Sequence, residues 1–271
     1  MLSINPPLAR TILVAFLREE VTRTGLKRAV VGLSGGIDSA LSCCLAAEAL
    51  GAENVLAARL PYKTSSPESL AHAQLVIDQL GVPSETFSIT DMVDPVLATI
   101  PESDSKRRGN VMARARMIMV YDRSAATNAL VIGTGNKTEI LLGYTTLFGD
   151  SASALNPLGD LYKTQVRQLA QEVGVPAPLI DKAPSADLWP GQTDEGEMGL
   201  TYERVDQLLY LLVDQRYRLE ECVAAGFEKP FVERVLTLIR RSQFKRMPPI
   251  IAKLSNRTIG YDFLYLRDWG T

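Results

Sequence analysis

The sequence contains few cysteines, and this scarcity excludes one class of fold. Only three occur among 271 residues, and the adjacent pair Cys43 and Cys44 cannot readily bridge to each other, while Cys222 lies far away along the chain. A domain held together by a disulfide framework is therefore excluded. Three reduced thiols in a cytoplasmic protein are expected instead.

The sequence also lacks a long apolar run and an excess of charge of one sign. No stretch approaches the roughly 20 apolar residues of a membrane span. Near the N-terminus, Arg10, Arg18, Glu19 and Glu20 interrupt the apolar residues, unlike the pattern of a signal peptide. The formal net charge is -2, whereas a dedicated nucleic-acid binder usually has a clear basic excess. We therefore expect a soluble, cytoplasmic protein with no nucleic-acid or membrane partner.

The composition provides ample material for a packed core. Hydrophobic residues make up 46% and charged residues 22% of the chain, as in ordinary globular domains. Short apolar runs alternate with helical periodicity in the first half. The expected strands are 28–33, 55–60, 85–89 and 129–132, and the expected helices are 4–23, 39–50, 66–80, 91–100 and 110–128. This alternation predicts an α/β fold with a doubly wound parallel sheet flanked by helices.

The second half of the chain has a different pattern. Helical periodicity continues in 164–173, 201–213, 219–225 and 229–241, and the stretch 175–199 between them is rich in Pro, Asp and Gly. The length suits one large domain or two small ones. We predict a single domain over residues 1–271, with a nucleotide-binding α/β core over about 24–165 and a mostly helical C-terminal elaboration over about 166–271.

A glycine-rich turn follows the first expected strand and leads into a helix. It consists of Gly32, Leu33, Ser34, Gly35, Gly36, Ile37, Asp38 and Ser39. Glycines let the backbone approach an anion closely, and a helix N-terminus offers free N–H groups and a partial positive charge. The serines add hydroxyl donors, and Asp38 fits beside a phosphate if a divalent cation lies between them. A turn that merely needs glycine and a serine cap is the alternative, but the full pattern favours a phosphate loop.

The phosphate loop differs from two better-known nucleotide motifs. It has no Gly-Lys-Ser/Thr as in Walker A, and it lacks the spacing of Gly-x-Gly-x-x-Gly. Ser-Gly-Gly-x-Asp-Ser instead resembles the loop of the pyrophosphate-loop ATPases, a group of enzymes that split ATP between its α and β phosphates. The motif alone predicts adenylation and does not identify the acceptor.

Further motifs narrow the resemblance. They lie at 110–117, 131–139, 143–150, 157–166, 183–189 and 191–195. Together they closely resemble the NAD synthetase family, in order from about Ser34 to Lys245. The resemblance implies an adenine nucleotide alpha-hydrolase-like fold and ATP-dependent amidation of deamido-NAD to NAD. In that reaction the nicotinate carboxylate attacks the α-phosphate to give NAD-adenylate and pyrophosphate, and ammonia then displaces AMP.

The resemblance also assigns residues to roles. Asp38 and Lys163 are implied as catalytic, and Asp38 and Glu139 as ligands of Mg²⁺. The implied ATP contacts outside the phosphate loop are Arg59, Thr134, Lys163 and Ser185, and the implied deamido-NAD contacts are Arg114, Phe244 and Lys245. Without the resemblance, Glu139 is typical of an ordinary carboxylate at a helix N-terminus, Lys163 of a solvated lysine and Arg114 of a surface residue. His72 is expected on a helix surface, without a catalytic role.

Two positions depart from the family pattern. Many members have Lys where this chain has Leu147 and Asp where it has Ala154, and both are usually assigned to deamido-NAD. The segment around Leu147 is similar to the synthetase portion of glutamine-dependent NAD synthetases, which carry a separate glutaminase domain. We expect ammonia as nitrogen donor, ATP as co-substrate and a homodimer. The alternatives are a synthetase subunit fed by a separate glutaminase, another adenylating amidotransferase or tRNA-modifying member, and a non-catalytic nucleotide-binding regulator.

Overall fold

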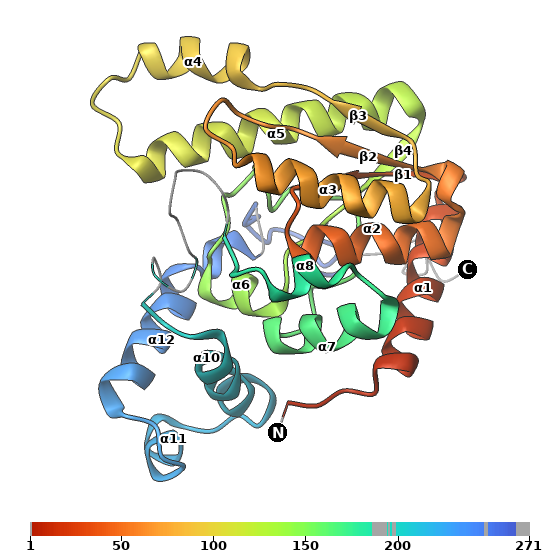
Figure 1. The fold of residues 1–271 in the computed structure, drawn as a ribbon. Helices are drawn as coiled ribbons and strands as arrows, with labels where there is room; N and C mark the ends of the chain where they lie inside the picture. Colours follow the sequence, from red (N-terminus) through yellow and green to blue (C-terminus); the bar gives the residue numbers. More distant parts are fainter. Residues whose placement is uncertain (1, 186–193, 195, 197–198, 247–248, 264–271) are drawn as a thin grey trace.

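The computed structural model describes residues 2–185, 194, 196, 199–246 and 249–263. A parallel sheet forms the centre of this part of the chain (Figure 1). Its strands are β1 (Arg28–Gly32), β2 (Val55–Arg59), β3 (Ser84–Thr86) and β4 (Ala129–Ile132). They pair in the order β3-β2-β1-β4, and all three pairings are parallel. The predicted fold class is therefore confirmed, and the strands lie close to their expected positions, except that β3 ends at Thr86 and not at 89.

The sheet is buried on both faces, as parallel sheets are. In β1, Ala29 and Val31 belong to one hydrophobic cluster and Val30 to another, because successive side chains point to opposite faces. Helices cover the two faces as separate layers (Figure 1). One layer contains α1 (Pro6–Arg23), α2 (Ile37–Leu50), α3 (Pro67–Leu80), α7 (Lys163–Val173) and α8 (Ala177–Asp181), and the other contains α4 (Thr90–Ala98) and α5 (Ser105–Thr127).

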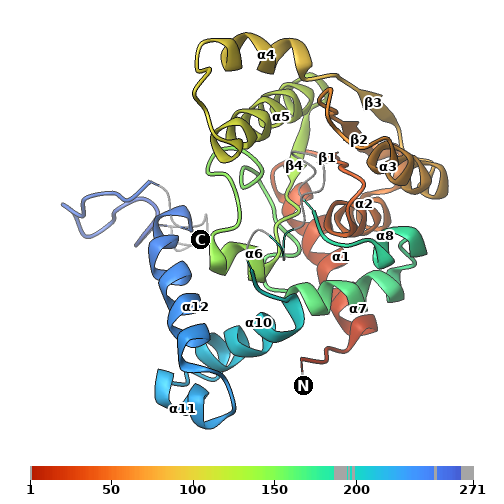
Figure 2. The ribbon, with the colours of Figure 1, turned by 60° about the vertical axis from the view of Figure 1, so that its left-hand side comes forward.

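A third hydrophobic cluster holds the later helices together beside the sheet (Figure 2). It involves α6 (Lys137–Leu142), α10 (Tyr202–Leu209), a π-helical segment labelled η2 (Tyr210–Asp214), α11 (Leu219–Ala224) and α12 (Lys229–Arg241). Two short 3₁₀ turns, η1 (Ala52–Asn54) and η3 (Gln243–Lys245), complete the described elements. Helix α6 contacts both α10 and α12, so this helical part joins the sheet through the segment that follows β4.

Most differences between the expected and observed elements lie at helix starts. α5 begins at Ser105 rather than at 110, because the Asp104 side chain accepts a hydrogen bond from the Arg107 amide at 2.7 Å and caps the helix. α6 was not among the helices expected from periodicity, since its six residues are too few to show it, although Glu139 alone was typical of a helix N-terminus. Gly36 caps α2, so the helix starts at Ile37, inside the predicted phosphate loop.

His72 was wrongly expected on a helix surface. It lies on α3 with only 9% of its surface exposed, one turn after Ser69. All three cysteines are free, as expected, and all three are buried. Burial raises the pKa of the Cys43 thiol to about 12 and that of Cys44 to about 11, which makes both unreactive. Among the residues that the structure describes, no helix has the length and apolar character needed to cross a membrane.

Candidate active site

The phosphate loop runs from the end of β1 into the first turn of α2. Gly35 has φ +82°, and a Cβ atom there would lie 2.1 Å from the carbonyl oxygen of Ser69 at the start of α3. Only glycine fits, both for its backbone conformation and for this close approach. The Leu33 amide donates to the Ala58 carbonyl at 2.8 Å, which fixes the start of the loop to β2.

The two serines of the loop hold it closed. The Ser34 and Ser39 hydroxyls are 3.0 Å apart, and Ser39 Oγ also accepts from the Ser34 amide at 3.2 Å. The Gly36 amide donates to Ser34 Oγ at 3.3 Å. These hydroxyls and amides lie at the N-terminus of α2, where an anion is favoured. The loop therefore has the donors that a phosphate or pyrophosphate group requires.

Asp38 lies in the first turn of α2 and meets residues distant in sequence. The Lys163 ammonium forms an ion pair with Asp38 and lies 3.4 Å from Glu139 Oε1. Lys163 is only 2% exposed. The predicted catalytic pair and the two predicted metal ligands are therefore brought together at one ammonium group. We call Asp38, Glu139 and Lys163 the charge cluster.

Asn136 connects the two carboxylates of the charge cluster. Its side-chain amide donates to Asp38 Oδ1 at 3.0 Å, and its side-chain oxygen accepts from the Glu139 amide at 3.0 Å. The Asn136 amide in turn donates to Glu139 Oε2 at 3.3 Å, which completes a capping box at the start of α6. The cap of α6 thus positions Glu139 against α2.

A buried carboxylate from the C-terminal helices positions Lys163. Asp206 on α10 is fully buried and accepts three hydrogen bonds, from Thr138 Oγ1 at 2.6 Å and from the Thr164 amide and hydroxyl at 2.8 Å each. The Thr138 hydroxyl also accepts from the Lys163 amide at 3.0 Å. Asp206 therefore ties the start of α7 to α6, and so fixes the position of Lys163.

Burial and charge act in opposite directions in the charge cluster. Burial raises the pKa of Glu139 to about 8, although the Lys163 charge opposes this shift. For Lys163, burial lowers the pKa, but the charges of Asp38 and Glu139 outweigh it and the pKa lies above its usual value. Lys163 therefore stays protonated and acts as the counter-ion of the two carboxylates.

The donor atoms of the charge cluster suit a divalent cation. Mg²⁺ commonly takes one or two carboxylates together with phosphate oxygens and water. Asp38 and Glu139 supply two carboxylates next to a loop with phosphate-binding donors. Within the described parts of the chain, no group of three or more His, Cys, Asp or Glu side chains is arranged to hold a metal. A metal here would therefore depend on ligands from a bound nucleotide.

Three further residues were predicted to contact ATP. Arg59 ends β2; it donates to Gln74 Oε1 at 2.6 Å, and its buried Nε has no hydrogen-bond partner among the described residues. Thr134 is half-buried in the turn after β4. Ser185 is half-buried and follows Pro184, whose carbonyl accepts from the Asp194 amide at 3.0 Å. The parallel strands place Arg59 and Thr134 at the same edge of the sheet as the phosphate loop.

The residues predicted to contact deamido-NAD surround the segment after α6. Arg114 on α5 donates to the Leu147 carbonyl at 3.3 Å. Lys245 donates to the carbonyls of Gly143 at 2.7 Å and Thr145 at 2.6 Å, and burial lowers its pKa. Its neighbour Phe244 is 51% exposed. Arg114 and Lys245 thus both contact the segment 143–147, and Leu147 within this segment is half-buried.

Sequence reasoning missed four buried polar residues around the charge cluster: Asn136, Asp194, Tyr202 and Asp206. Asn136 carried a usable signal, because Asn followed three residues later by Glu predicts a capping box. The other three carried no local signal. The motif 191–195 was part of the family resemblance, but apart from Asp194 it lies outside the described residues.

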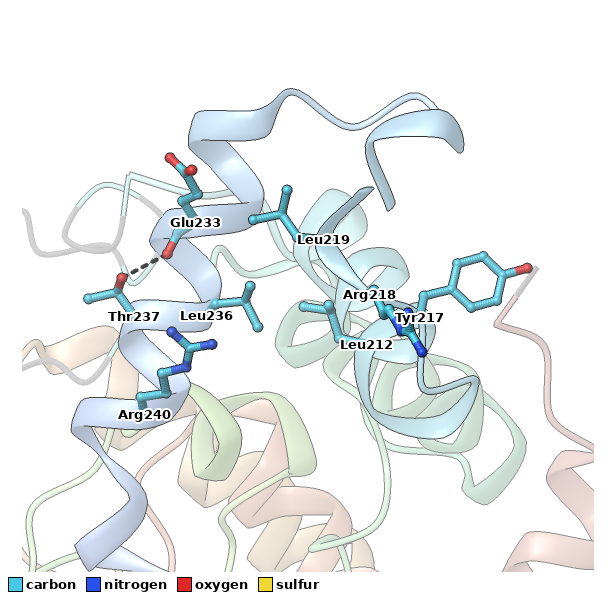
Figure 3. A pocket seen from close by; sticks show the side chains of 8 residues that line it. All are labelled: Leu212, Tyr217, Arg218, Leu219, Glu233, Leu236, Thr237 and Arg240. Atoms are coloured by element: carbon cyan, nitrogen blue, oxygen red, sulfur yellow. Dashed lines mark hydrogen bonds between the residues drawn. The ribbon is translucent and has the colours of Figure 1, made fainter. Parts of the chain in front are cut away.

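One cavity in the described part of the chain lies away from all of these residues (Figure 3). It has a volume of about 680 Å³ and lies between η2 and α12. Leu212 and Leu236 face it from opposite sides, and Arg240 lies along the α12 side (Figure 3). None of the residues predicted to bind a ligand lines it.

Comparisons with known proteins agree with the geometry. A family model described as NAD synthase matches residues 10–249. The NH(3)-dependent NAD(+) synthetase of Trichlorobacter lovleyi is 59% identical over 269 residues, which are 99% of this chain and 98% of that protein. The corresponding protein of Chlorobaculum tepidum is 56% identical, over 97% and 95% of the two chains.

Solved structures give the same result at lower identity. The NMN synthetase of Francisella tularensis has a TM-score of 0.81 at 34% identity, over 94% of this chain and 100% of that one. The NH3-dependent NAD synthetase of Campylobacter jejuni has a TM-score of 0.79 at 30% identity, over 93% and 100%. Because the family model covers most of the chain and full-length relatives exceed half identity, this chain belongs to the NAD synthase family.

Proposed function

We propose that this chain catalyses the ATP-dependent amidation of deamido-NAD to NAD, with ammonia as the nitrogen donor. The observation that carries the proposal is the charge cluster next to the phosphate loop. Asp38, Glu139 and Lys163 meet there although 125 positions separate Asp38 from Lys163. The full-length relatives named NH(3)-dependent NAD(+) synthetases support the choice of acceptor and nitrogen donor.

The first step forms the adenylate. A carboxylate oxygen of deamido-NAD attacks the α-phosphorus of ATP, and the bond to the bridging oxygen of the β-phosphate breaks. The serine hydroxyls and amides of the phosphate loop receive the departing pyrophosphate. Asp38 and Glu139 would hold Mg²⁺, which when bound neutralises charge on the phosphates. Lys163 supplies a further positive charge next to them.

The second step forms the amide. The nitrogen of ammonia attacks the acyl carbon, the carbon–oxygen bond to the phosphate breaks, and AMP leaves with that electron pair. One proton is released overall. No nucleophilic side chain is required, since binding and electrostatic stabilisation carry both steps. This agrees with a cluster made of carboxylates and one ammonium group.

The proposal also covers the domain organisation, the location and the oligomeric state of the enzyme. Residues 1–271 act as a single synthetase unit, supported by the contacts that Asp206 makes with α6 and α7. The enzyme works in the cytoplasm, supported by three free thiols. It forms a homodimer, for which the exposed apolar residues Ile118 and Tyr121 on α5 are candidate contacts. Sedimentation velocity of the purified chain tests the dimer.

A reaction assay tests the activity. Purified protein is incubated with ATP, Mg²⁺, deamido-NAD and ammonium chloride, and NAD, AMP and pyrophosphate are measured. Equal amounts of the three products are expected. Glutamine in place of ammonium should give no NAD; an equal rate with glutamine would contradict the choice of ammonia. ATP binding without turnover would contradict the enzyme activity itself.

A matched pair of variants tests the role of Asp38. Asp38→Asn should lower kcat by about 10²–10³, as the loss of one preorganised charge interaction does. Asp122→Asn is the control, because Asp122 is an exposed carboxylate paired with Arg123 on α5. The control should keep wild-type activity. Near-normal turnover of Asp38→Asn would remove this carboxylate from the reaction.

A second candidate product is NMN. The Francisella tularensis structure named an NMN synthetase has a TM-score of 0.81 with this chain. In addition, Leu147 and Ala154 stand where the dinucleotide was expected to meet a Lys and an Asp. Comparing kcat/KM for deamido-NAD with that for the corresponding mononucleotide acid separates the two. The proposal expects the dinucleotide to be preferred.

A further inference from the structure

The phosphate loop contains no positively charged side chain of its own. Residues 32–39 include the carboxylate of Asp38 but neither lysine nor arginine, and the rest of α2 has none either. In a Walker A loop, by contrast, a lysine reaches the β- and γ-phosphates. The ammonium of Lys163 is shared with Asp38 and Glu139. Since a triphosphate keeps a negative charge even with Mg²⁺ bound, a further cation from another part of the chain is expected.

Lys182 brings an ammonium group to the start of α3. This half-buried residue directly follows α8, and its Nζ donates to Ser69 Oγ at 3.1 Å. Ser69 is only 6% exposed, and its carbonyl oxygen lies against the phosphate loop, 2.1 Å from where a Cβ on Gly35 would be. A single residue, Ser69, therefore contacts both the Lys182 ammonium and the phosphate loop.

The surroundings of Lys182 leave its charge available to a ligand. Helix α8 packs against α2 and α7, which places its C-terminal end in the layer that carries the phosphate loop (Figure 2). A lysine with only a structural role at a helix end would bond to the last carbonyls of that helix or pair with a carboxylate. Lys182 instead reaches across to α3, and within the described residues its side chain has no ion pair. A half-buried ammonium bonded to a neutral hydroxyl favours an added anion.

We propose that Lys182 binds the β- and γ-phosphates of ATP, and then the pyrophosphate that leaves. This inference rests on the proposed function, because it names a further binding residue for the leaving group of that reaction. A phosphate oxygen is a stronger acceptor for the ammonium than the Ser69 hydroxyl is, since the hydrogen bond becomes charge-assisted on both sides. Lys163 divides its charge between two carboxylates, whereas the charge of Lys182 acts on the phosphates alone.

Binding measurements that need no turnover test this role. In the presence of Mg²⁺, calorimetric titration of Lys182→Met should give Kd values for pyrophosphate and ATP that are about tenfold or more above wild type, as the loss of a charge-assisted hydrogen bond predicts. AMP lacks both of these phosphates, so its Kd should stay within about twofold of wild type. An unchanged Kd for pyrophosphate, or an equal rise for AMP, would overturn the proposal.

Two further variants separate phosphate binding from a structural role. Ser69→Ala removes the hydroxyl that Lys182 contacts but keeps the ammonium, so its Kd for pyrophosphate should stay within about threefold of wild type. An equal loss in Ser69→Ala and Lys182→Met would show that the contact only holds α8 against α3, which overturns the proposal. Lys229→Met removes an exposed lysine 3.9 Å from Glu233 on α12 and should bind pyrophosphate as wild type does. An equal loss there would indicate a general effect of net charge, with the same consequence.

Chemical labelling of the wild-type protein keeps the proposal testable if Lys182→Met folds poorly. With limiting acetic anhydride, magnesium pyrophosphate in excess over its Kd should lower the acetylation of Lys182 by about threefold or more, measured by mass spectrometry, and leave Lys229 unchanged. Equal acetylation of Lys182 with and without pyrophosphate would contradict its role. None of these measurements uses deamido-NAD. A wild-type protein that binds pyrophosphate through Lys182 but makes no NAD would therefore refute the proposed function alone.

Discussion

The counter-ion role of Lys163 leads to a quantitative prediction for Lys163→Met. Lys163 is 2% exposed and is the cation that faces Asp38 and Glu139. Methionine has a similar length and keeps most of the apolar contacts of the lysine stem, so little change in packing is expected. The variant therefore removes mainly the charge.

The loss of stability can be worked out from the carboxylate that remains. Removing one partner of a buried ion pair costs about 3–5 kcal/mol, because an uncompensated charge stays buried. We expect the free energy of unfolding of Lys163→Met to fall by this amount.

Urea unfolding in the absence of divalent cations measures this loss. Lys137→Met is the matched control, because Lys137 pairs with Asp160 and Asp214 near the surface. It should cost about 1 kcal/mol or less. A loss for Lys163→Met no larger than that for Lys137→Met would refute the reasoning, since no unpaired buried charge would then have been left behind.

Magnesium provides an independent check of the same prediction. If Asp38 and Glu139 bind Mg²⁺, the ion can replace the missing ammonium, and the added stability grows with its concentration relative to Kd. Mg²⁺ should therefore stabilise Lys163→Met more than wild type. Formation of NAD should remain impaired in the presence of Mg²⁺, because the ion does not restore the lysine next to the phosphates.

Three further predictions follow from single contacts. Gly35→Ala should lower the free energy of unfolding by about 3 kcal/mol and weaken ATP binding, because the added Cβ would meet the Ser69 carbonyl. Gly81→Ala is the control: Gly81 also has a positive φ but open space around it, so the same urea titration should show a loss of only about 1 kcal/mol. The folded state of wild type binds a proton at Glu139 more tightly than the unfolded chain, with a pKa of about 8. The free energy of unfolding of wild type should thus fall relative to that of Glu139→Gln as pH rises from about 4.3 to 8, by at most about 1.4 kcal/mol per pH unit. A difference between the two proteins that stays constant over this pH range would contradict the raised pKa. Asp206→Asn should lower the free energy of unfolding by about 2 kcal/mol, since one of three buried donors loses its acceptor, and should also raise the KM for ATP. An unchanged KM for ATP would limit Asp206 to a role in stability.

The sheet could be predicted because its signals are local. Each strand is a short apolar run buried on both faces, and each connecting helix has a clear start or stop, such as Gly81 at the end of α3. The missed start of α5 lies in a polar stretch, where only the cap by Asp104 marks the helix. Helix α6 was missed because six residues provide too little periodicity.

Only the part of the site that lies in sequence motifs could be predicted. The phosphate loop was evident from adjacent residues, and the roles of Glu139 and Lys163 came from resemblance. The burial of Lys163 and its direct pairing with Asp38 could not be read from a pattern, because they depend on how α7 packs beside α2. Asp194 and Asp206 were missed for the same physical reason: their partners are brought near by tertiary packing.

The helical C-terminal part is joined to the chemistry of the α/β core through Asp206. Its carboxylate bonds to Thr138 at the start of α6 and to Thr164 at the start of α7. These two helices carry Glu139 and Lys163, so their separation depends on Asp206, which lies 42 positions after Thr164. Because an ion pair weakens steeply when its groups separate in a site of low dielectric constant, a small shift of α10 would loosen the charge cluster. The helices beyond the sheet thus set the geometry of the site as well as covering it.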